Sequence, residues 1–470
     1  MASFSLLETK PDAQLAEGGQ PRRILAVWTR ALDGVDGAGR VNVARSVRNA
    51  LAPLGSFTET RLQNALERRR LSGAGAAAWA LLRGLLTGRP LPLQCALFAD
   101  PRSIADAADA AADSDVVYLD GVRTLPLLRH LRRRRPGAQI VVDADDLMSR
   151  RYAELINQKL PLSLGYLEAR VPRPVVRFVK SRAVARMVLG YERLALRHAE
   201  RELLALADRV VLLNREEAGM LRAEAGRLPT PPRASVLAIP PVVGSWVRRR
   251  VSWSSPGAHL RAVFIGTDAL TQNRLTIDFL LDLWQRERFS MPLVIYGRQA
   301  RVERRVPNVT WAGYVKDIPE VYAPGSILVT PSFLRGGIKT KVLEGFAYGV
   351  PVVGSSVTLE GLDLPDYPLC FDDRDALADF LRAPSSHSGA IARALKMEEE
   401  CLRRDHAGPV FAARWAEAVL GRRGIDSALE PQARDELQGG ALFARRDRAR
   451  ATRGFNDNSS SAGFAPAAGE

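Results

Sequence analysis

Short apolar runs, many of them rich in β-branched residues, alternate with longer helix-like segments along most of this 470-residue chain. The pattern begins with ILAVWT at 24–29 and continues through VVYLD, IVVDAD and RVVLL until a proline-rich stretch at 228–243. It begins again with AVFIGT at 262–267 and ends with VPVVGSS at 350–356. Strands that alternate with helices of ten or more residues form parallel sheets in α/β domains. The sequence therefore predicts two such domains, joined by a proline-rich linker.

The expected domain limits follow from these patterns. We place a first Rossmann-like domain at 21–243 and a second at 244–423, which suits the length of the chain. A last helical segment, near 391–421, belongs to the second domain or packs back on the first. Residues 1–20 precede the first strand-like run, and 424–470 is rich in Arg, Asp, Ser, Gly and Ala, so we expect disordered tails at both ends.

The chain is strongly basic, with a net charge of +15 and a pI near 10.2. A positive surface attracts the phosphates of a nucleic acid, an anionic lipid or a nucleotide. The segment 160–200 mixes apolar residues with arginine, which is typical either of a helix packed on its own sheet or of one lying on an anionic membrane. The arginine run at 129–137 has no interleaved aromatic residues, so we expect a solvated helix end and no nucleic-acid partner.

The sequence predicts a cytoplasmic protein, either free or peripheral on the cytoplasmic face of the inner membrane. Its start lacks the basic residues and apolar core of a signal peptide. The most apolar segment, 74–88, is shorter than the roughly 20 residues that cross a bilayer, and Arg83 interrupts it. Cys95, Cys370 and Cys401 are odd in number and far apart, which favours a reducing compartment.

The stretch GGIKTKVLEGFAYGVPVV, residues 336–353, has the composition of an anion site. Gly336 and Gly337 allow close approach to the backbone, and a helix that begins after them presents unpaired N–H groups. Lys339 and Lys341 add positive charge at the helix end where the dipole disfavours it. Such a helix start is suited to bind a phosphate.

Glu344 follows one turn later on the same predicted helix. In open α/β sheets, ligands bind beside the carboxyl ends of the strands and the helix N-termini. A carboxylate there can accept two hydrogen bonds from the vicinal hydroxyls of a ribose. The alternative is an ion pair between Lys341 and Glu344 on an exposed helix face.

These residues resemble the nucleotide-sugar signature of retaining glycosyltransferases of family four, which have the GT-B fold. Three further stretches follow the order of that family: DGVDGAGRVNVARSVRNAL, ADRVVLLNREEAGML and GYVKDIPEVYAPGSILVTPS. The resemblance covers about 22–420 and is stronger in the second domain. One departure concerns the donor sugar, because family members commonly have a glutamate where this chain has Gly336.

The resemblance implies two Rossmann-like domains that face each other across a cleft, with a nucleoside-diphosphate sugar bound to the second. The implied donor-binding residues are Gly266, Thr267, Arg274, Gly337, Ile338, Lys339, Lys341 and Glu344. Gly37 and Gly39 form a turn or a donor loop from the first domain, and Arg40 after them is expected to be a solvated helix residue. No metal or other cofactor is expected. A catalytic histidine of the family corresponds to Asp120, so its role does not carry over directly.

The first domain offers polar candidates where its predicted strands end. Asp120 and Asp145 are candidate catalytic residues, and Asp143, Asp146 and Asn214 are candidates for the acceptor side. The D-x-D spacing of Asp143 and Asp145 is open to three interpretations: an acceptor contact, a helix cap, or a Mg²⁺ or Mn²⁺ site.

The predicted function is therefore retaining transfer of a sugar from a nucleoside-diphosphate sugar to a saccharide acceptor. We expect a lipid-linked acceptor, contact with the anionic inner membrane, and a place in exopolysaccharide or capsule biosynthesis. Two alternatives remain open at this point: a nucleotide-sugar epimerase, and a non-catalytic GT-B-like partner protein associated with membrane or polymer.

Overall fold

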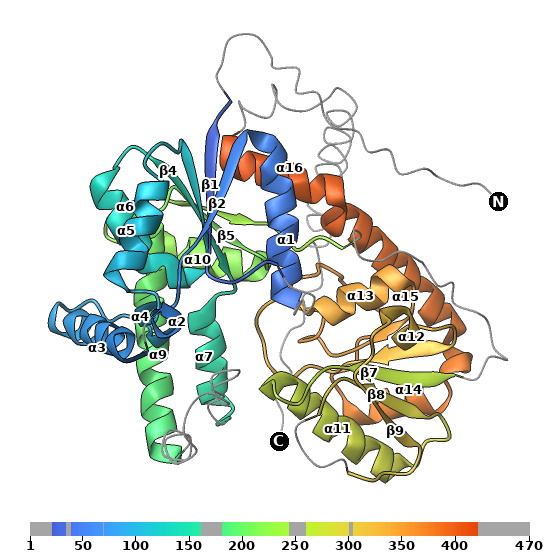
Figure 1. The fold of residues 1–470 in the computed structure, drawn as a ribbon. Helices are drawn as coiled ribbons and strands as arrows, with labels where there is room; N and C mark the ends of the chain where they lie inside the picture. The colour runs from blue at the N-terminus through green and yellow to red at the C-terminus, as the bar shows by residue number, and fades with distance from the viewer. Residues whose placement is uncertain are drawn as a thin grey trace, which may run out of the picture.

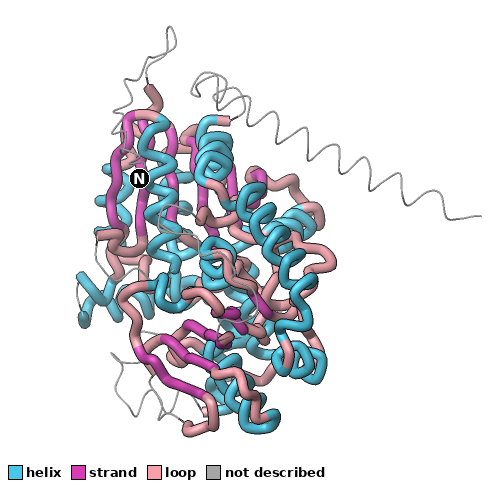
Figure 2. The backbone as a smooth tube through the Cα atoms, turned by 90° about the vertical axis from the view of Figure 1, so that its right-hand side faces the viewer, coloured by secondary structure: helices cyan, strands magenta, loops and turns pink. Residues whose placement is uncertain are grey.

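The structure is a computed structural model that describes residues 21–33, 39–68, 70–160, 181–243, 260–299 and 304–421. It has two lobes, each built on a parallel sheet that is flanked by helices (Figures 1 and 2). The predicted α/β class with two Rossmann-like units is confirmed. The predicted disordered tails, 1–20 and 424–470, lie outside the described residues.

The first lobe contains a six-stranded sheet in the order β2-β1-β3-β4-β5-β6, with every pair parallel. Its strands are β1 Arg23–Trp28, β2 Ser56–Arg61, β3 Val116–Asp120, β4 Gln139–Asp145, β5 Arg209–Leu212 and β6 Ser235–Ala238. The strand β6 lies within 228–243, so the interpretation of this whole stretch as a linker is wrong. A four-residue strand at a sheet edge tolerates nearby prolines, because only one of its sides must pair.

Helices cover both faces of this sheet, which is why its central strands read as continuous apolar runs. They are α1 Gly39–Leu51, α2 Ala65–Arg68, α3 Arg70–Leu86, α4 Leu93–Ala96, α5 Pro101–Ala110, α6 Leu125–Arg134, α7 Met148–Asn157, α9 Arg182–Leu206 and α10 Arg215–Ala225. No described helix is long and apolar enough to cross a membrane. The arginine run ends α6, where Arg129 and Arg132 pair with Glu202 and Asp208 at 2.7 Å.

The second lobe contains a five-stranded sheet in the order β11-β10-β7-β8-β9. Its strands are β7 Arg261–Ile265, β8 Leu293–Tyr296, β9 Val309–Gly313, β10 Ser326–Val329 and β11 Val352–Val353. Its helices are α11 Thr271–Glu287, α12 Ile318–Val321, α13 Thr340–Tyr348, α14 Arg374–Arg382 and α15 Ser388–Cys401. The strand order reverses between β7 and β10, and such a switch point is where doubly wound sheets bind ligands.

The last described helix returns to the first lobe. A π-helical turn, Leu402–His406, follows α15, and α16, Gly408–Leu420, then lies beside α1 (Figure 1). Trp415 of α16 is fully buried against Tyr118 of β3, with ring centroids 5.6 Å apart. The end of the chain therefore completes the core of the first lobe.

His406 lies at the point where the chain crosses between the lobes. Its Nδ1 is 2.6 Å from the carbonyl oxygen of Pro241, and its own carbonyl accepts a hydrogen bond from the Val243 amide at 2.9 Å. The ring is buried. Burial lowers the pKa of His406 to about 4, although the hydrogen bond to Pro241 favours the charged form.

We predict that His406 makes the protein less stable in mild acid. Between about pH 6.5 and 4 the unfolded chain binds a proton at this residue and the folded protein does not, so the free energy of unfolding falls as the pH falls. The slope contributed by one such group is about 1.4 kcal/mol per pH unit. Urea unfolding at a series of pH values should show a steeper acid loss for the wild type than for His406→Gln. Equal slopes would contradict the prediction.

Candidate active site

The head of α13 lies at the switch point of the second sheet. Gly336 and Gly337 precede it with φ values of 102° and 66°, a backbone region that strongly favours glycine. Lys339 occupies the N-cap position without a side-chain cap, and the amides of Ile338 and Lys339 donate to no other residue that the structure describes. Two N–H groups therefore remain available at a positive helix end.

The two glycine amides, in contrast, already have partners. The Gly336 amide donates to Glu360 Oε2 at 3.1 Å, and the Gly337 amide donates to Glu217 Oε1 at 3.3 Å. The Gly337 amide, which we expect to bind the donor, is therefore already bonded in this arrangement of the lobes. A carboxylate satisfies such N–H groups in the same way as a phosphate does.

Charged residues of the first lobe surround this loop. Arg150 of α7 forms an ion pair with Glu360, and Arg151 pairs with Asp146 at 2.6 Å. A Cβ at Gly337 would lie 2.6 Å from Asp146 Oδ1, so only glycine fits here without displacing the aspartate. The acceptor-side candidate Asp146 thus lies directly against the loop of Gly336 and Gly337, and the two lobes are in contact at this place.

Lys341 is half-buried beneath the end of β7. Its Nζ donates to Asn273 Oδ1 at 2.8 Å and lies 4.2 Å from the centroid of the Phe264 ring. Among the described residues it has no acidic group at ion-pair distance, and burial lowers its pKa to about 7. Asn273 in turn donates to the Thr267 carbonyl at 3.0 Å, and it lies against Gly266, where a Cβ would be 2.7 Å from Nδ2. The structure therefore brings Gly266, Thr267 and Lys341 together.

Glu344 lies on the same helix and lines the cleft between the lobes. It accepts a hydrogen bond from the Tyr322 hydroxyl at 3.1 Å, and burial raises its pKa to about 7. The Tyr322 ring stacks on Tyr348 with centroids 4.9 Å apart, which fixes the hydroxyl. Because Lys341 and Glu344 are half-buried and form no ion pair, the alternative of a surface ion pair on an exposed face does not fit.

The remaining donor-binding candidates of the second lobe have structural partners. Arg274 donates from Nε to the Asp268 carbonyl at 3.3 Å, which holds its guanidinium near the loop after β7. Ile338 packs against the core of the second lobe. Lys339 donates from Nζ to the carbonyls of Gly336 and Gly337 at 3.1 and 3.3 Å, and burial lowers its pKa. These contacts shape the loop whether or not a ligand is bound.

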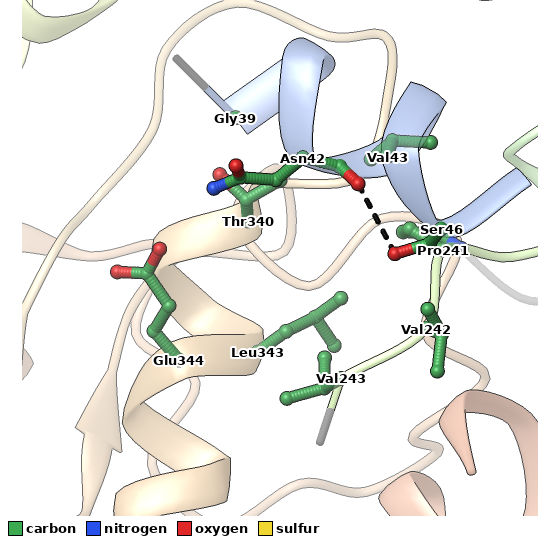
Figure 3. Close-up of a pocket in the computed structure, with 10 residues that line it drawn as sticks. All are labelled: Gly39, Asn42, Val43, Ser46, Pro241, Val242, Val243, Thr340, Leu343 and Glu344. Atoms are coloured by element: carbon green, nitrogen blue, oxygen red, sulfur yellow. Dashed lines mark hydrogen bonds between the residues drawn. The ribbon is translucent and has the colours of Figure 1, made fainter. Parts of the chain in front are cut away.

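A small pocket separates α13 from α1 of the first lobe (Figure 3). Its lining comes from both lobes: Gly39, Asn42, Val43, Ser46, Pro241, Val242, Val243, Thr340, Leu343 and Glu344. A Cβ at Gly39 would lie 3.1 Å from Thr340 Oγ1, so the glycine lets α1 approach the head of α13. The other predicted loop glycine, Gly37, lies outside the described residues.

Arg40 holds the aspartates where the first-lobe strands end. Its guanidinium contacts Asp143 at 2.8 Å, Asp145 at 3.0 Å and Asp120 at 3.4 Å. Its side chain is only 16% exposed, so the expectation of a solvated helix residue is wrong. The guanidinium also supplies positive charge between the two aspartates of the D-x-D spacing. No group of three or more potential metal ligands occurs among the residues described.

Asp120 and Asp145 differ in how far solvent or a ligand can reach their carboxylates. Asp120 is fully buried and accepts hydrogen bonds from the amide and hydroxyl of Thr29. Burial would raise the pKa of Asp120, but Arg30 and Arg40 outweigh it and hold the pKa below its ordinary value. Asp145 has a φ of 71° and a side chain that is 28% exposed, and burial raises its pKa to about 7. Of the two catalytic candidates, Asp145 is thus the partly exposed one with a raised pKa, and Asp120 is the fully buried one with a lowered pKa.

Asn214 and Glu217 occupy the start of α10. The Asn214 side chain caps the helix by accepting from the Glu216 amide at 2.8 Å, and it lies against Gly361 of the second lobe. The spacing of Asn214 and Glu217 is that of a capping box, which predicts that Glu217 bonds back to the cap residue. It instead contacts the amides of Leu147 and Gly337. Sequence reasoning therefore missed Glu217, and it missed Glu360 and Arg150 because nothing local marks them.

The comparisons with known proteins agree with this geometry. Residues 260–383 match the family model described as Glycosyl transferases group 1. The matched range contains β7 to β11 and every donor-binding residue predicted in the second lobe. The second lobe thus carries a glycosyltransferase group 1 domain, and the predicted glycosyltransferase class is confirmed.

No curated protein sequence matched the chain. Its fold is similar to the crystal structure of Anabaena Alr3699/HepE in complex with UDP, with a TM-score of 0.51 and 12% identity over 84% of this chain and 98% of that one. It is equally similar to trehalose-6-phosphate synthase OtsA, with a TM-score of 0.51 and 12% identity over 84% and 97%. With TarM the TM-score is 0.44 at 11% identity, over 67% of this chain and 58% of that one. The predicted GT-B fold is confirmed.

We predict that Arg40 is essential for the stability of the first lobe. Arg40→Met would leave three neighbouring carboxylates without their shared cation, and breaking a buried ion pair costs about 3–5 kcal/mol. Arg48→Met is the matched control, because Arg48 lies on the same helix and makes only long, partly exposed contacts of 3.6 and 3.7 Å. That control should cost less than about 1 kcal/mol. Chemical denaturation of both variants measures the difference, and equal losses would refute the role of Arg40.

Proposed function

We propose that the protein is a retaining glycosyltransferase that moves a sugar from a nucleoside-diphosphate sugar to a saccharide acceptor. The glycosyltransferase group 1 domain at 260–383 supports the class of reaction. One observation carries the donor site: Lys341 and Glu344 are half-buried on one helix, and neither forms an ion pair with another described residue. Burying charge without a partner is unfavourable, so this pair fits a site completed by a ligand.

In this proposal the diphosphate binds at the head of α13. The amides of Ile338 and Lys339 and the Lys341 ammonium hold its oxygens, and the loop of Gly266 and Thr267 lies beside it. Glu344 accepts hydrogen bonds from the ribose hydroxyls. Fixed amides and an ammonium stabilise the charge of the departing diphosphate, so the donor site needs no metal.

The reaction breaks the bond between the anomeric carbon and the diphosphate oxygen. A hydroxyl oxygen of the acceptor forms the new bond on the same face of the sugar, and its proton passes to an oxygen of the departing diphosphate. The nucleoside diphosphate leaves as the second product. The residues of α13 act chiefly by holding the leaving group, which stabilises charge that develops in the transition state.

Contact between the lobes opposes donor binding in the arrangement seen here. Glu217 of the first lobe and Glu360 occupy the glycine amides beside the proposed diphosphate site. Two carboxylates next to a diphosphate repel it. We therefore propose that the donor enters when the lobes separate and Glu217 leaves the Gly337 amide.

The acceptor side of the proposed site lies at the strand ends of the first lobe. Asp145 is partly exposed there and burial raises its pKa to about 7, and Asp146 and Asn214 lie at the contact with the second lobe. We propose a lipid-linked saccharide acceptor, used at the cytoplasmic face of the inner membrane in exopolysaccharide or capsule assembly. The basic character of the chain supports this setting.

Binding of UDP, GDP and ADP tests the proposed donor site. Calorimetry should find one nucleotide that binds the wild type, and Glu344→Ala should weaken it roughly tenfold or more, about 1.4 kcal/mol. Glu400→Ala is the control, because Glu400 is exposed on α15 of the same lobe and away from the cleft. If no nucleotide binds to the folded protein, a non-catalytic partner protein is the better interpretation. Conversion of the donor sugar without an acceptor would instead indicate an epimerase.

We also predict a pH dependence of nucleotide binding that is set by Lys341. The ammonium form binds the diphosphate, so the Kd should rise as the pH increases above about 7, by up to tenfold per pH unit. Lys341→Arg keeps its charge throughout this range. The titration of the nucleotide itself is common to both proteins and cancels in the comparison. Parallel Kd curves for wild type and Lys341→Arg would exclude Lys341 as the titrating group.

A further inference from the structure

The helix α3 presents an apolar face to solvent. Trp79 is 62% exposed, Leu82 47%, Leu85 57% and Leu86 75%. With 3.6 residues per turn these positions share one side of the helix, and the buried residues Ala77 and Gly84 lie on the other. A soluble surface rarely gathers so many large apolar side chains in one place, and such patches mark sites of interaction.

The charge around this face is positive. Arg83 lies on the exposed side of α3, and Arg89 is exposed in the turn that follows. The sequence contains no aspartate or glutamate between Glu67 and Asp100. Neither arginine forms an ion pair with another residue in the described part of the chain. The surface that α3 and the following turn contribute is therefore apolar and cationic.

The first half of α9 also exposes large apolar side chains and arginines. Met187 and Leu194 are 68% and 62% exposed, and they alternate with exposed Arg186 and Arg193 along one stripe of the helix. No acidic residue occurs between 181 and 191. Glu192 is the first acidic residue after 181; it is buried and accepts a hydrogen bond from the Leu93 amide.

The two helices protrude from the same end of the first lobe (Figure 1). The segment after α3 is fastened to α9, because the Tyr191 hydroxyl donates to the Leu91 carbonyl at 2.7 Å and Glu192 accepts from Leu93 at 2.6 Å. Figure 1 places this end away from α16 and at the side of the first lobe opposite the second lobe's helices α14 and α15. The apolar and cationic residues of both helices thus belong to one part of the molecule.

We propose that α3 and the first half of α9 form a docking surface for an anionic lipid bilayer. Trp79, Leu82, Leu85 and Leu86 enter the boundary between headgroups and acyl chains. Arg83, Arg186 and Arg193 bind the lipid phosphates. Tryptophan and leucine beside arginine are the residue types that hold a helix in the interface plane.

The charge distinguishes a bilayer from a second copy of the chain. Two copies that met through this surface would bring unpaired arginines together, and like charges repel. Anionic headgroups neutralise the same arginines, and each arginine strengthens the attraction to such a membrane. The helix lies on the bilayer instead of crossing it, because 17 residues span only about 25 Å and one of them is Arg83.

Vesicle sedimentation of the full chain tests the surface. The wild type should bind vesicles of phosphatidylcholine mixed with phosphatidylglycerol more strongly than vesicles of phosphatidylcholine alone. The double variant Trp79→Ser with Leu86→Ser should bind at least roughly tenfold more weakly, because two large apolar side chains no longer leave water on binding. Met220→Ser with Tyr314→Ser is the matched control, because these side chains are 44% and 55% exposed elsewhere on the molecule.

A variant that removes charge separates the electrostatic from the apolar contribution to vesicle binding. Arg83→Gln, Arg186→Gln and Arg193→Gln together should weaken binding to the anionic vesicles and reduce its salt dependence. The proposal is overturned if the wild type binds neither kind of vesicle, or if the control variant loses as much binding as the apolar one. Dimers that the apolar variant abolishes would show that a second copy occupies the surface instead.

The test of vesicle binding does not depend on whether the proposed donor site binds a nucleotide. Nucleotide binding measured on the same samples should be unchanged by the apolar and the charge variants, because their residues lie on α3 and α9 of the first lobe and not on the second lobe that carries α13. Vesicle binding without nucleotide binding would refute the proposed glycosyltransferase and leave the docking surface intact. Nucleotide binding without vesicle binding would refute only the proposed docking surface. Docking would also bring the cleft to a lipid-linked acceptor; this last step rests on the proposed function.

Discussion

The cleft depends on one buried guanidinium. Arg40 neutralises the aspartates that end β3 and β4, and without it these carboxylates would repel one another in a region with little water. Arg40 also follows Gly39, which lies against Thr340 at the head of α13. The ion cluster therefore fixes both the polar floor of the first lobe and the position of the helix that meets the second lobe.

Across the cleft, carboxylates occupy amides that lie beside the proposed diphosphate site. Glu217 contacts Gly337, and Glu360 contacts Gly336 while it pairs with Arg150 of the first lobe. The same amides cannot serve a carboxylate and a phosphate together. In the proposed function, these carboxylates lie beside the diphosphate site and repel a diphosphate, so contact between the lobes opposes the proposed donor binding.

Much of the fold could be predicted, because parallel strands buried on both faces leave continuous apolar runs in the sequence. The edge strands β2 and β6 were missed, since an edge strand is short and partly polar or flanked by proline. The helix α13 and the glycines before it could be predicted because their signals are local. Arg40 was misjudged, since a sequence shows that a residue is charged but not that three distant carboxylates surround it.

The sequence by itself determined the two α/β units and the placement of glycine, lysine and glutamate at the start of α13. These features follow from periodicity, from backbone freedom and from the chemistry of helix ends, which act over a few residues. Only the tertiary structure decided which carboxylates reach the glycine amides, which aspartates share Arg40, and that α16 returns to the first core. Except for Glu360 and Gly336, which are 24 positions apart, those contacts join residues more than 70 positions apart, and packing in three dimensions, not local preference, selects them.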